Sequence, residues 1–137
     1  MIAATKDPDS SAGRSVVLVV DDDFDIREAL SDVLASEGYS VVTAADGGEA
    51  LDRLRGGIRP DVMLLDLMMP RVSGVEVIDA LRKDESLRQI PVVVCSANRG
   101  YGPDDLGVHD VLRKPVSVEE LLDAVARAIR PRRPLQN

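Results

Sequence analysis

The residues of this chain that could do chemistry gather at the ends of its apolar runs. Six of them stand there: Asp21, Asp22, Asp23, Asp66, Ser96 and Lys114. Neighbouring carboxylates repel one another, and a bound cation removes that repulsion. Ligation by carboxylate oxygens, with water in the remaining positions, suits Mg²⁺. The ammonium and the hydroxyl would then complement an oxyanion on the other side of the metal.

Each of these residues also has an ordinary structural explanation. An aspartate after a strand commonly caps the following helix, which we expect for Asp23. Asp21 and Asp22 cannot both cap the same helix. A serine at a strand end is commonly a turn residue, and a lysine before a proline is unremarkable by itself. Their joint placement at the ends of four apolar runs favours the functional interpretation.

Two apolar patterns alternate along the chain. Continuous runs, typical of strands buried in a parallel sheet, cover residues 16–20, 41–42, 62–65 and 92–95, with a weaker run at 111–112. Stretches with helical spacing lie between and after them. The first carries Ile26, Leu30, Val33 and Leu34 on one face, and the last carries Val118, Leu121, Leu122, Val125 and Ile129. Capping boxes are expected at residues 46–49 and 117–120.

This alternation predicts an α/β fold. We expect a doubly wound, five-stranded parallel sheet with strand order 2-1-3-4-5 and helices on both faces. In such sheets the ligand site lies beyond the carboxyl ends of the strands. The predicted topology therefore brings the six residues to one edge of the sheet.

Length and composition limit the class of protein. The 137 residues suit one domain, expected at 14–130 between flexible tails at 1–13 and 131–137. A single cysteine, Cys95, excludes an intrachain disulfide. No apolar run approaches the roughly 18–20 residues of a membrane span, and residues 1–14 lack the apolar core of a signal peptide, so we expect a cytoplasmic protein without a membrane partner. A net charge of −7 disfavours nucleic acid as a partner.

Four segments, in this order along the chain, carry a family resemblance: VLVVDDD at 17–23 followed by DIREAL, DVMLLDLMMPRVSG at 61–74, SA at 96–97 and KP at 114–115. Together they resemble the receiver domain of two-component response regulators, over about residues 14–130. The resemblance implies a flavodoxin-like fold. It also implies that Asp66 accepts a phosphoryl group from a phosphohistidine of a sensor histidine kinase or a histidine phosphotransfer protein.

The resemblance also assigns roles to the other site residues. Asp22 and Asp66 would bind Mg²⁺ directly, together with the backbone carbonyl of Met68, and Asp21 would act through a metal-bound water. Ser96 and Lys114 would hold phosphoryl oxygens, with a cis bond between Lys114 and Pro115. Phosphoryl transfer needs chiefly positioning and charge neutralisation, so this set is chemically sufficient.

Two features depart from the family pattern. Receivers usually carry Tyr or Phe three residues before the lysine, where this chain has Val111, so an aromatic switch at that position is not expected. The stretch 96–114 is also short for the family and contains three glycines and Pro103. It predicts that the fourth helix is shortened or missing, with at most one or two turns near 103–107. We expect the loop 97–110 to become ordered on phosphorylation.

Several functions compete at this stage. The favoured one is a single-domain response regulator, not an enzyme, that signals by docking to, or relaying phosphoryl to, a separate partner protein. A phosphatase with an aspartate nucleophile from the run 21–23, read as a D-x-D pair, would leave Asp66 without a role. A nucleotide- or flavin-binding module would need a glycine-rich phosphate loop, and none follows a strand. A degenerate receiver is disfavoured because every site position holds a competent residue.

Overall fold

The computed structural model describes residues 14–69, 71–97, 100 and 102–129. Its strands are β1 (Val16–Val20), β2 (Ser40–Ala44), β3 (Val62–Asp66), β4 (Val92–Ser96) and β5 (Asp110–Arg113). Its helices are α2 (Phe24–Ser36), α3 (Gly47–Arg55), α4 (Gly74–Arg82), α5 (Pro103–Leu106) and α6 (Val118–Ile129). The predicted tails 1–13 and 131–137 lie outside the described residues.

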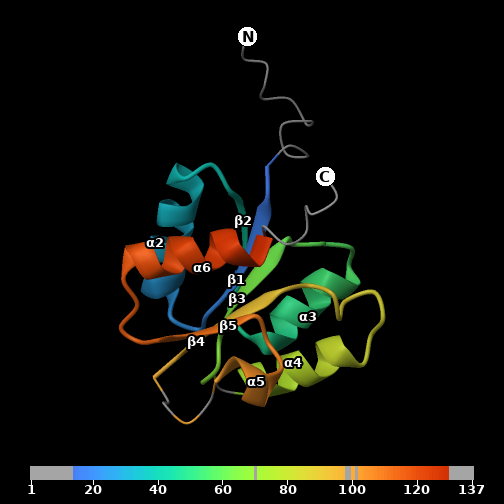
Figure 1. Ribbon diagram of the computed structural model, residues 1–137. Coiled ribbons are helices and arrows are strands. Elements are labelled where there is room, and N and C mark those ends of the chain that lie inside the picture. Colours follow the sequence, from blue (N-terminus) through green and yellow to red (C-terminus); the bar gives the residue numbers. More distant parts are fainter. Residues whose placement is uncertain (1–13, 70, 98–99, 101, 130–137) are drawn as a thin grey trace, which may run out of the picture.

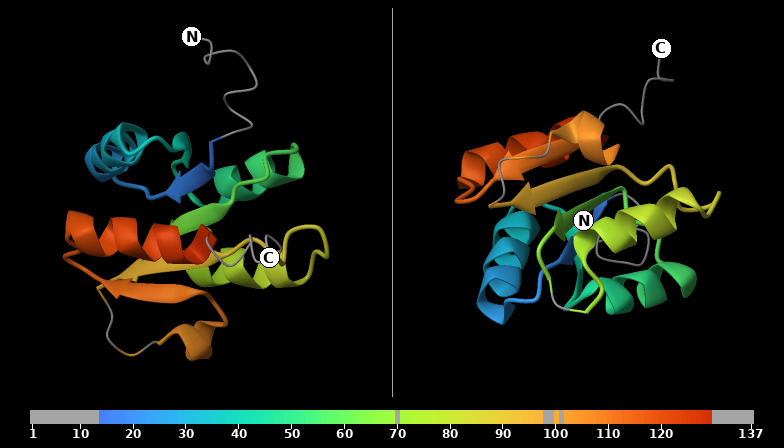
Figure 2. Two further views of the ribbon diagram at one scale, coloured as in Figure 1. Left: turned by 45° about the horizontal axis from the view of Figure 1, so that its top comes forward. Right: turned by 90° about the horizontal axis from the view of Figure 1, so that it is seen from below.

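All strand pairs are parallel, and the sheet order is β2-β1-β3-β4-β5. Helices α2 and α6 cover one face of the sheet, and α3 and α4 cover the other, with α5 beside α4 (Figure 1). Figure 2 shows the same two layers of helices seen along other directions. The predicted doubly wound fold and its strand order are therefore confirmed.

The central strands are buried on both faces, as their continuous apolar runs predict. Alternate residues of β1 and β3 divide between two cores. Leu18 and Met63 pack toward α3 and α4, whereas Val17 and Val62 pack toward α2 and α6. Both core faces end at the carboxyl edge of the sheet, so a rigid scaffold positions the residues that follow the strands.

Local capping explains where the helices begin. The carboxylate of Asp23 accepts the backbone N–H of Ile26 at the start of α2, as expected. Before α6, Ser117 and Glu120 form the predicted reciprocal box. At α3 the box is only half formed. Asp46 accepts from the Glu49 N–H, but Oε1 of Glu49 accepts from the N–H of Ala45.

Two helices test the packing predictions. The fourth helix is reduced to the four-residue α5, which confirms the shortening predicted from the glycines and Pro103. The apolar face predicted for the first helix is only partly buried. In α2 only Leu34 is buried, and Ile26 is 40% exposed. The first turns of α2 therefore do not pack tightly against the sheet.

Candidate functional site

The turn after β1 is held by hydrogen bonds that leave its carboxylates at the edge of the sheet. The N–H of Asp21 donates to the carbonyl of Ala44 (3.3 Å), and Oδ1 of Asp21 accepts the N–H of Asp23 (2.9 Å). Nη1 of Arg27 donates to the Asp21 carbonyl (2.8 Å). Sequence reasoning missed this role of Arg27, although its place one turn into the expected helix was a usable signal.

Asp66 is the last residue of β3, between β1 and β4 in the sheet. The chain after it turns back tightly, because the N–H of Gly74 donates to the carbonyl of Leu67 (3.1 Å). A Cβ at Gly74 would lie 2.7 Å from Cα of Leu67, so only glycine fits there. Ser73 and Glu76 then cap α4 in a reciprocal box that was readable in the sequence but was not singled out.

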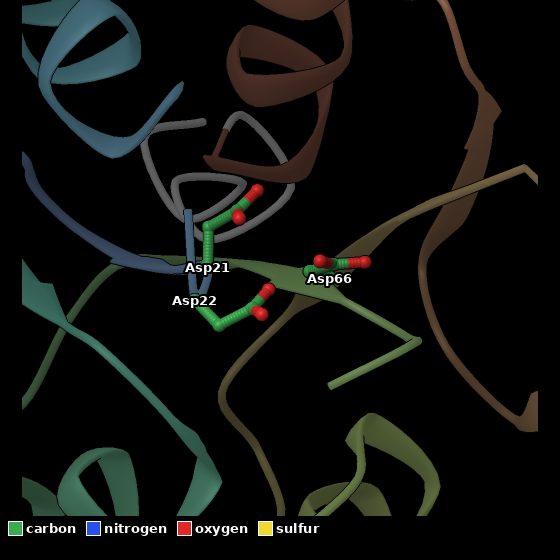
Figure 3. Close-up of side chains that lie close together, drawn as sticks. All are labelled: Asp21, Asp22 and Asp66. Carbon is green, nitrogen blue, oxygen red and sulfur yellow. The ribbon is translucent and has the colours of Figure 1, made fainter. Parts of the chain in front are cut away.

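Asp21, Asp22 and Asp66 come together as the strand-end argument predicts. One carboxylate oxygen from each lies within 4.8 Å of the other two. Figure 3 shows the three side chains close together, with the Asp22 carboxylate pointing toward Asp66. Asp21 and Asp66 are 4% and 7% exposed, and Asp22 is open to solvent. Three converging oxygens with one open side are the donor set that a hydrated Mg²⁺ requires, so the residues present fit that ion.

Burial sets the electrostatics of the cluster. It raises the pKa of Asp66, against the lowering effect of the Lys114 ammonium and of the Met68 N–H. Burial also raises the pKa of Asp21, and the neighbouring charge of Asp66 adds to that rise against the lowering effect of the Asp23 N–H. For both buried carboxylates, the groups that favour the charged form do not outweigh the effect of burial. A cation between the two would favour their charged forms.

Lys114 approaches the cluster from the other side. Its Nζ lies 3.4 Å from Oδ1 of Asp66, and the Lys114–Pro115 peptide is cis, as the family resemblance implies. The backbone of Lys114 is tied to β4, since its N–H donates to the carbonyl of Ser96 (3.0 Å). Ser96 itself ends β4 and is fully buried. The structure thus places the lysine at Asp66 and the serine at the neighbouring strand end.

Two further residues border Asp66. The N–H of Met68 donates to Oδ1 of Asp66 (3.2 Å), and the Met68 side chain is exposed. Cys95 precedes Ser96 on β4, and burial raises the pKa of its thiol to about 12. A thiol with so high a pKa is no nucleophile near neutral pH. Cys95 is therefore not a candidate nucleophile at this edge.

Comparisons with known proteins agree with this geometry. The sequence matches the response regulator receiver domain family over residues 17–126. The response regulator MprA of Mycobacterium avium is 41% identical over 122 residues, which cover 86% of this chain and 52% of that protein. MprA of Mycobacterium tuberculosis matches with the same identity and coverage. The chain thus spans about half the length of the curated relatives it matches.

Solved structures give the same result. A sensor protein from Polaromonas has a TM-score of 0.79 and 30% identity, covering 86% of this chain and 98% of that chain. The chemotaxis protein CheY4 of Vibrio cholerae has a TM-score of 0.74 and 34% identity, covering 84% and 98%. TrrA of Thermotoga maritima, solved in complex with Mg²⁺ and BeF, has a TM-score of 0.74 and 33% identity, covering 83% and 98%.

Proposed function

This chain belongs to the response regulator receiver domain family. We propose that it accepts a phosphoryl group on Asp66. The donor is a phosphohistidine of a sensor histidine kinase or of a histidine phosphotransfer protein. The observation that carries the proposal is the placement of Asp66, whose carboxylate lies among the oxygens of Asp21 and Asp22 and 3.4 Å from Nζ of Lys114. A carboxylate nucleophile between an acidic cation site and an ammonium suits phosphoryl transfer.

The reaction needs little from the chain beyond positioning. A carboxylate oxygen of Asp66 forms a bond to phosphorus while the bond from phosphorus to the histidine nitrogen breaks, and the imidazole leaves as a neutral ring because its other nitrogen already carries a proton. Mg²⁺ supplies charge neutralisation of the phosphoryl oxygens. Asp22, Asp66 and the carbonyl of Met68 would hold the ion directly, with Asp21 acting through a water.

Two residues then act on the phosphoryl group itself. Lys114, whose Nζ lies 3.4 Å from Oδ1 of Asp66, would donate a charge-assisted hydrogen bond to a phosphoryl oxygen. The hydroxyl of Ser96, at the adjacent strand end, would donate to another oxygen. Beyond accepting and losing its own phosphoryl group, the chain has no enzymatic activity in this proposal.

The output is proposed to be a protein contact. The phosphorylated chain docks to, or relays its phosphoryl group to, a separate partner protein in the cytoplasm. A net charge of −7 is unfavourable for contact with a phosphate backbone, which supports a protein rather than a nucleic acid. No helix in the described part of the chain is both long enough and apolar enough to cross a membrane.

The test is phosphorylation of the purified chain with acetyl phosphate and Mg²⁺, followed by intact mass. The wild-type chain should gain one phosphoryl group and Asp66→Asn none. Asp110→Asn, at the start of β5 and outside the cluster, is the matched control and should be labelled like the wild type. Labelling of Asp66→Asn at the wild-type level would overturn the proposal. Transfer from the histidine kinases of the host would then identify the donor.

A further inference from the structure

A cavity of about 450 Å³ lies against the sheet face that α2 and α6 cover. Val19 and Leu64 line it from the sheet, Ile26 and Leu30 from α2, and Leu121 from α6. Its volume falls in the range of about 300–1,000 Å³ that is usual for small-molecule sites. The cavity is therefore large enough for an organic ligand.

The cavity lies between α2 and α6, at the carboxyl edge of the sheet. Both helices cover this face (Figures 1 and 2), but Ile26 stays 40% exposed on the cavity side of α2. Farther along α2, Leu34 is fully buried in the core that α2 shares with α6. The open part of the interface is thus the part beside the phosphorylation site.

The polar groups of the cavity are charged, and their balance is negative. Asp21, Asp66 and Lys114 line it together with the apolar side chains. Asp22 lies within the same acidic cluster as Asp21 and Asp66. Among the described residues at this end of the cavity, three carboxylates face one ammonium, which is already paired with Asp66. The charge that complements this end of the cavity is positive.

We propose that this cavity binds a small amphipathic organic cation. Its ammonium or guanidinium group would lie between Asp21 and Asp66, and its apolar body would lie against Ile26 and Leu30 of α2, whose side chains are accessible in the cavity. Binding of such a cation and of Mg²⁺ would exclude each other, because both place positive charge between the same carboxylates. The exclusion rests on the proposed metal site, whereas the binding itself rests on the cavity and on the carboxylates at its end, whatever their function.

The first experiment compares three probes with the same apolar body. The probes 4-phenylbutylamine, 4-phenylbutanol and 4-phenylbutyrate are titrated into the isotope-labelled chain, and backbone amide shifts are followed by NMR. The amine should bind about tenfold or more tightly than the carboxylate, with the alcohol between them. The shifts should centre on Ile26, Leu30 and Leu121. Equal affinity for all three probes, or shifts centred elsewhere, would overturn the proposal.

Variants separate the cavity from the phosphorylation site. Leu30→Trp fills the cavity from a half-buried position and should abolish amine binding while acetyl phosphate still labels Asp66. Ile26→Trp is a second filling variant at a more exposed position, and circular dichroism checks the fold of both. Val75→Trp, on the exposed surface of α4, is the control and should keep both properties. Unchanged amine affinity in a folded filling variant would contradict the cavity site.

Competition with the metal completes the test. Added Mg²⁺ should raise the apparent dissociation constant of the amine linearly with the free Mg²⁺ concentration, without levelling off, and the amine should slow labelling by acetyl phosphate. An amine that binds in the cavity without competing would contradict the shared carboxylates and hence this binding mode. Failure of acetyl phosphate labelling in the wild type would instead count against the proposed function, whatever the amine does.

Discussion

At the scale of single residues, the charge on Asp66 opposes folding of the metal-free chain. Because burial holds its folded-state pKa above the usual 3.8, the folded chain binds more protons than the unfolded chain between those two values. The free energy of unfolding therefore falls as the pH rises from about 4 through the folded-state pKa. Asp21, whose pKa is raised for the same reason, adds to this fall.

Removing the charge of Asp66 should therefore stabilise the fold at neutral pH. Without metal at neutral pH, Asp66→Asn should unfold with a free energy about 1 kcal/mol higher than the wild type, an ordinary size for one substitution. At a pH well below 3.8, where the carboxyl is neutral in both states, the advantage should vanish. Urea unfolding at several pH values measures it, with the exposed Asp104→Asn as control. A variant that is less stable at neutral pH would contradict the account.

A second residue-scale prediction separates two neighbouring aspartates. Asp22 is open to solvent and is proposed as a direct ligand, whereas Asp21 is buried, accepts the Asp23 N–H and would act through a water. Asp22→Ala should therefore weaken Mg²⁺ binding more than Asp21→Ala. Calorimetric titration of each variant with Mg²⁺ measures the difference. The reverse order of affinities would reject the assigned ligand roles.

At the scale of elements, the short α5 depends on how it ends. Gly107 follows it with φ +68°, and the Arg82 guanidinium of α4 donates to the Leu106 carbonyl directly before that glycine. A Cβ at Gly107 would overlap the guanidinium. The helix thus ends on a left-handed glycine, with the N–H of Gly107 donating to the Pro103 carbonyl (2.8 Å) and the Arg82 guanidinium satisfying the Leu106 carbonyl.

The third prediction is that Gly107→Ala costs about 1–2 kcal/mol, the penalty of the left-handed conformation for a residue with a Cβ. The Arg82 guanidinium, at the end of a flexible side chain, would move aside to make room for the Cβ. Gly48→Ala, in the first turn of α3 where a Cβ meets only ordinary contacts, is the control and should be neutral or stabilising. Urea unfolding of both variants measures the difference, and equal stability would contradict it.

The sequence predicted the length of α5 but not how closely α2 packs on the sheet. The shortened α5 was predictable because Pro103 and the glycines act locally. The exposure of Ile26 was not, because helical spacing gives the direction of a side chain but not the angle at which α2 meets the sheet. Ordering of the loop 97–110 on phosphorylation stays a prediction, and residues 98, 99 and 101 lie outside the described part of the chain.

At the scale of the whole molecule, sheet register explains why the site could be predicted. Val20 pairs with Leu65, so the next residues, Asp21 and Asp66, must lie side by side at the sheet edge. Topology alone therefore identified the cluster. The depth of burial and the hydrogen bond from Arg27 depend on three-dimensional packing, which residue spacing does not contain.

The last prediction concerns how metal binding acts on the whole fold. Two buried cores hold the chain without metal, so a chelator should abolish labelling by acetyl phosphate while leaving far-ultraviolet circular dichroism nearly unchanged. Added Mg²⁺ should still raise the free energy of unfolding, by about 2.7 kcal/mol at one hundred times its dissociation constant, because only the folded chain assembles the site.

The pH dependence of the stabilisation by Mg²⁺ tests whether the ion binds to Asp21, Asp22 and Asp66. Protons compete with Mg²⁺ for Asp21 and Asp66, whose pKa values are raised, so the stabilisation by Mg²⁺ should shrink as the pH falls toward 4. Thermal unfolding with and without Mg²⁺ across pH measures it, and Asp22→Ala should need more metal for the same gain. If the stabilisation by Mg²⁺ does not depend on pH, or is unchanged in Asp22→Ala, the ion does not bind at the carboxyl ends of β1 and β3.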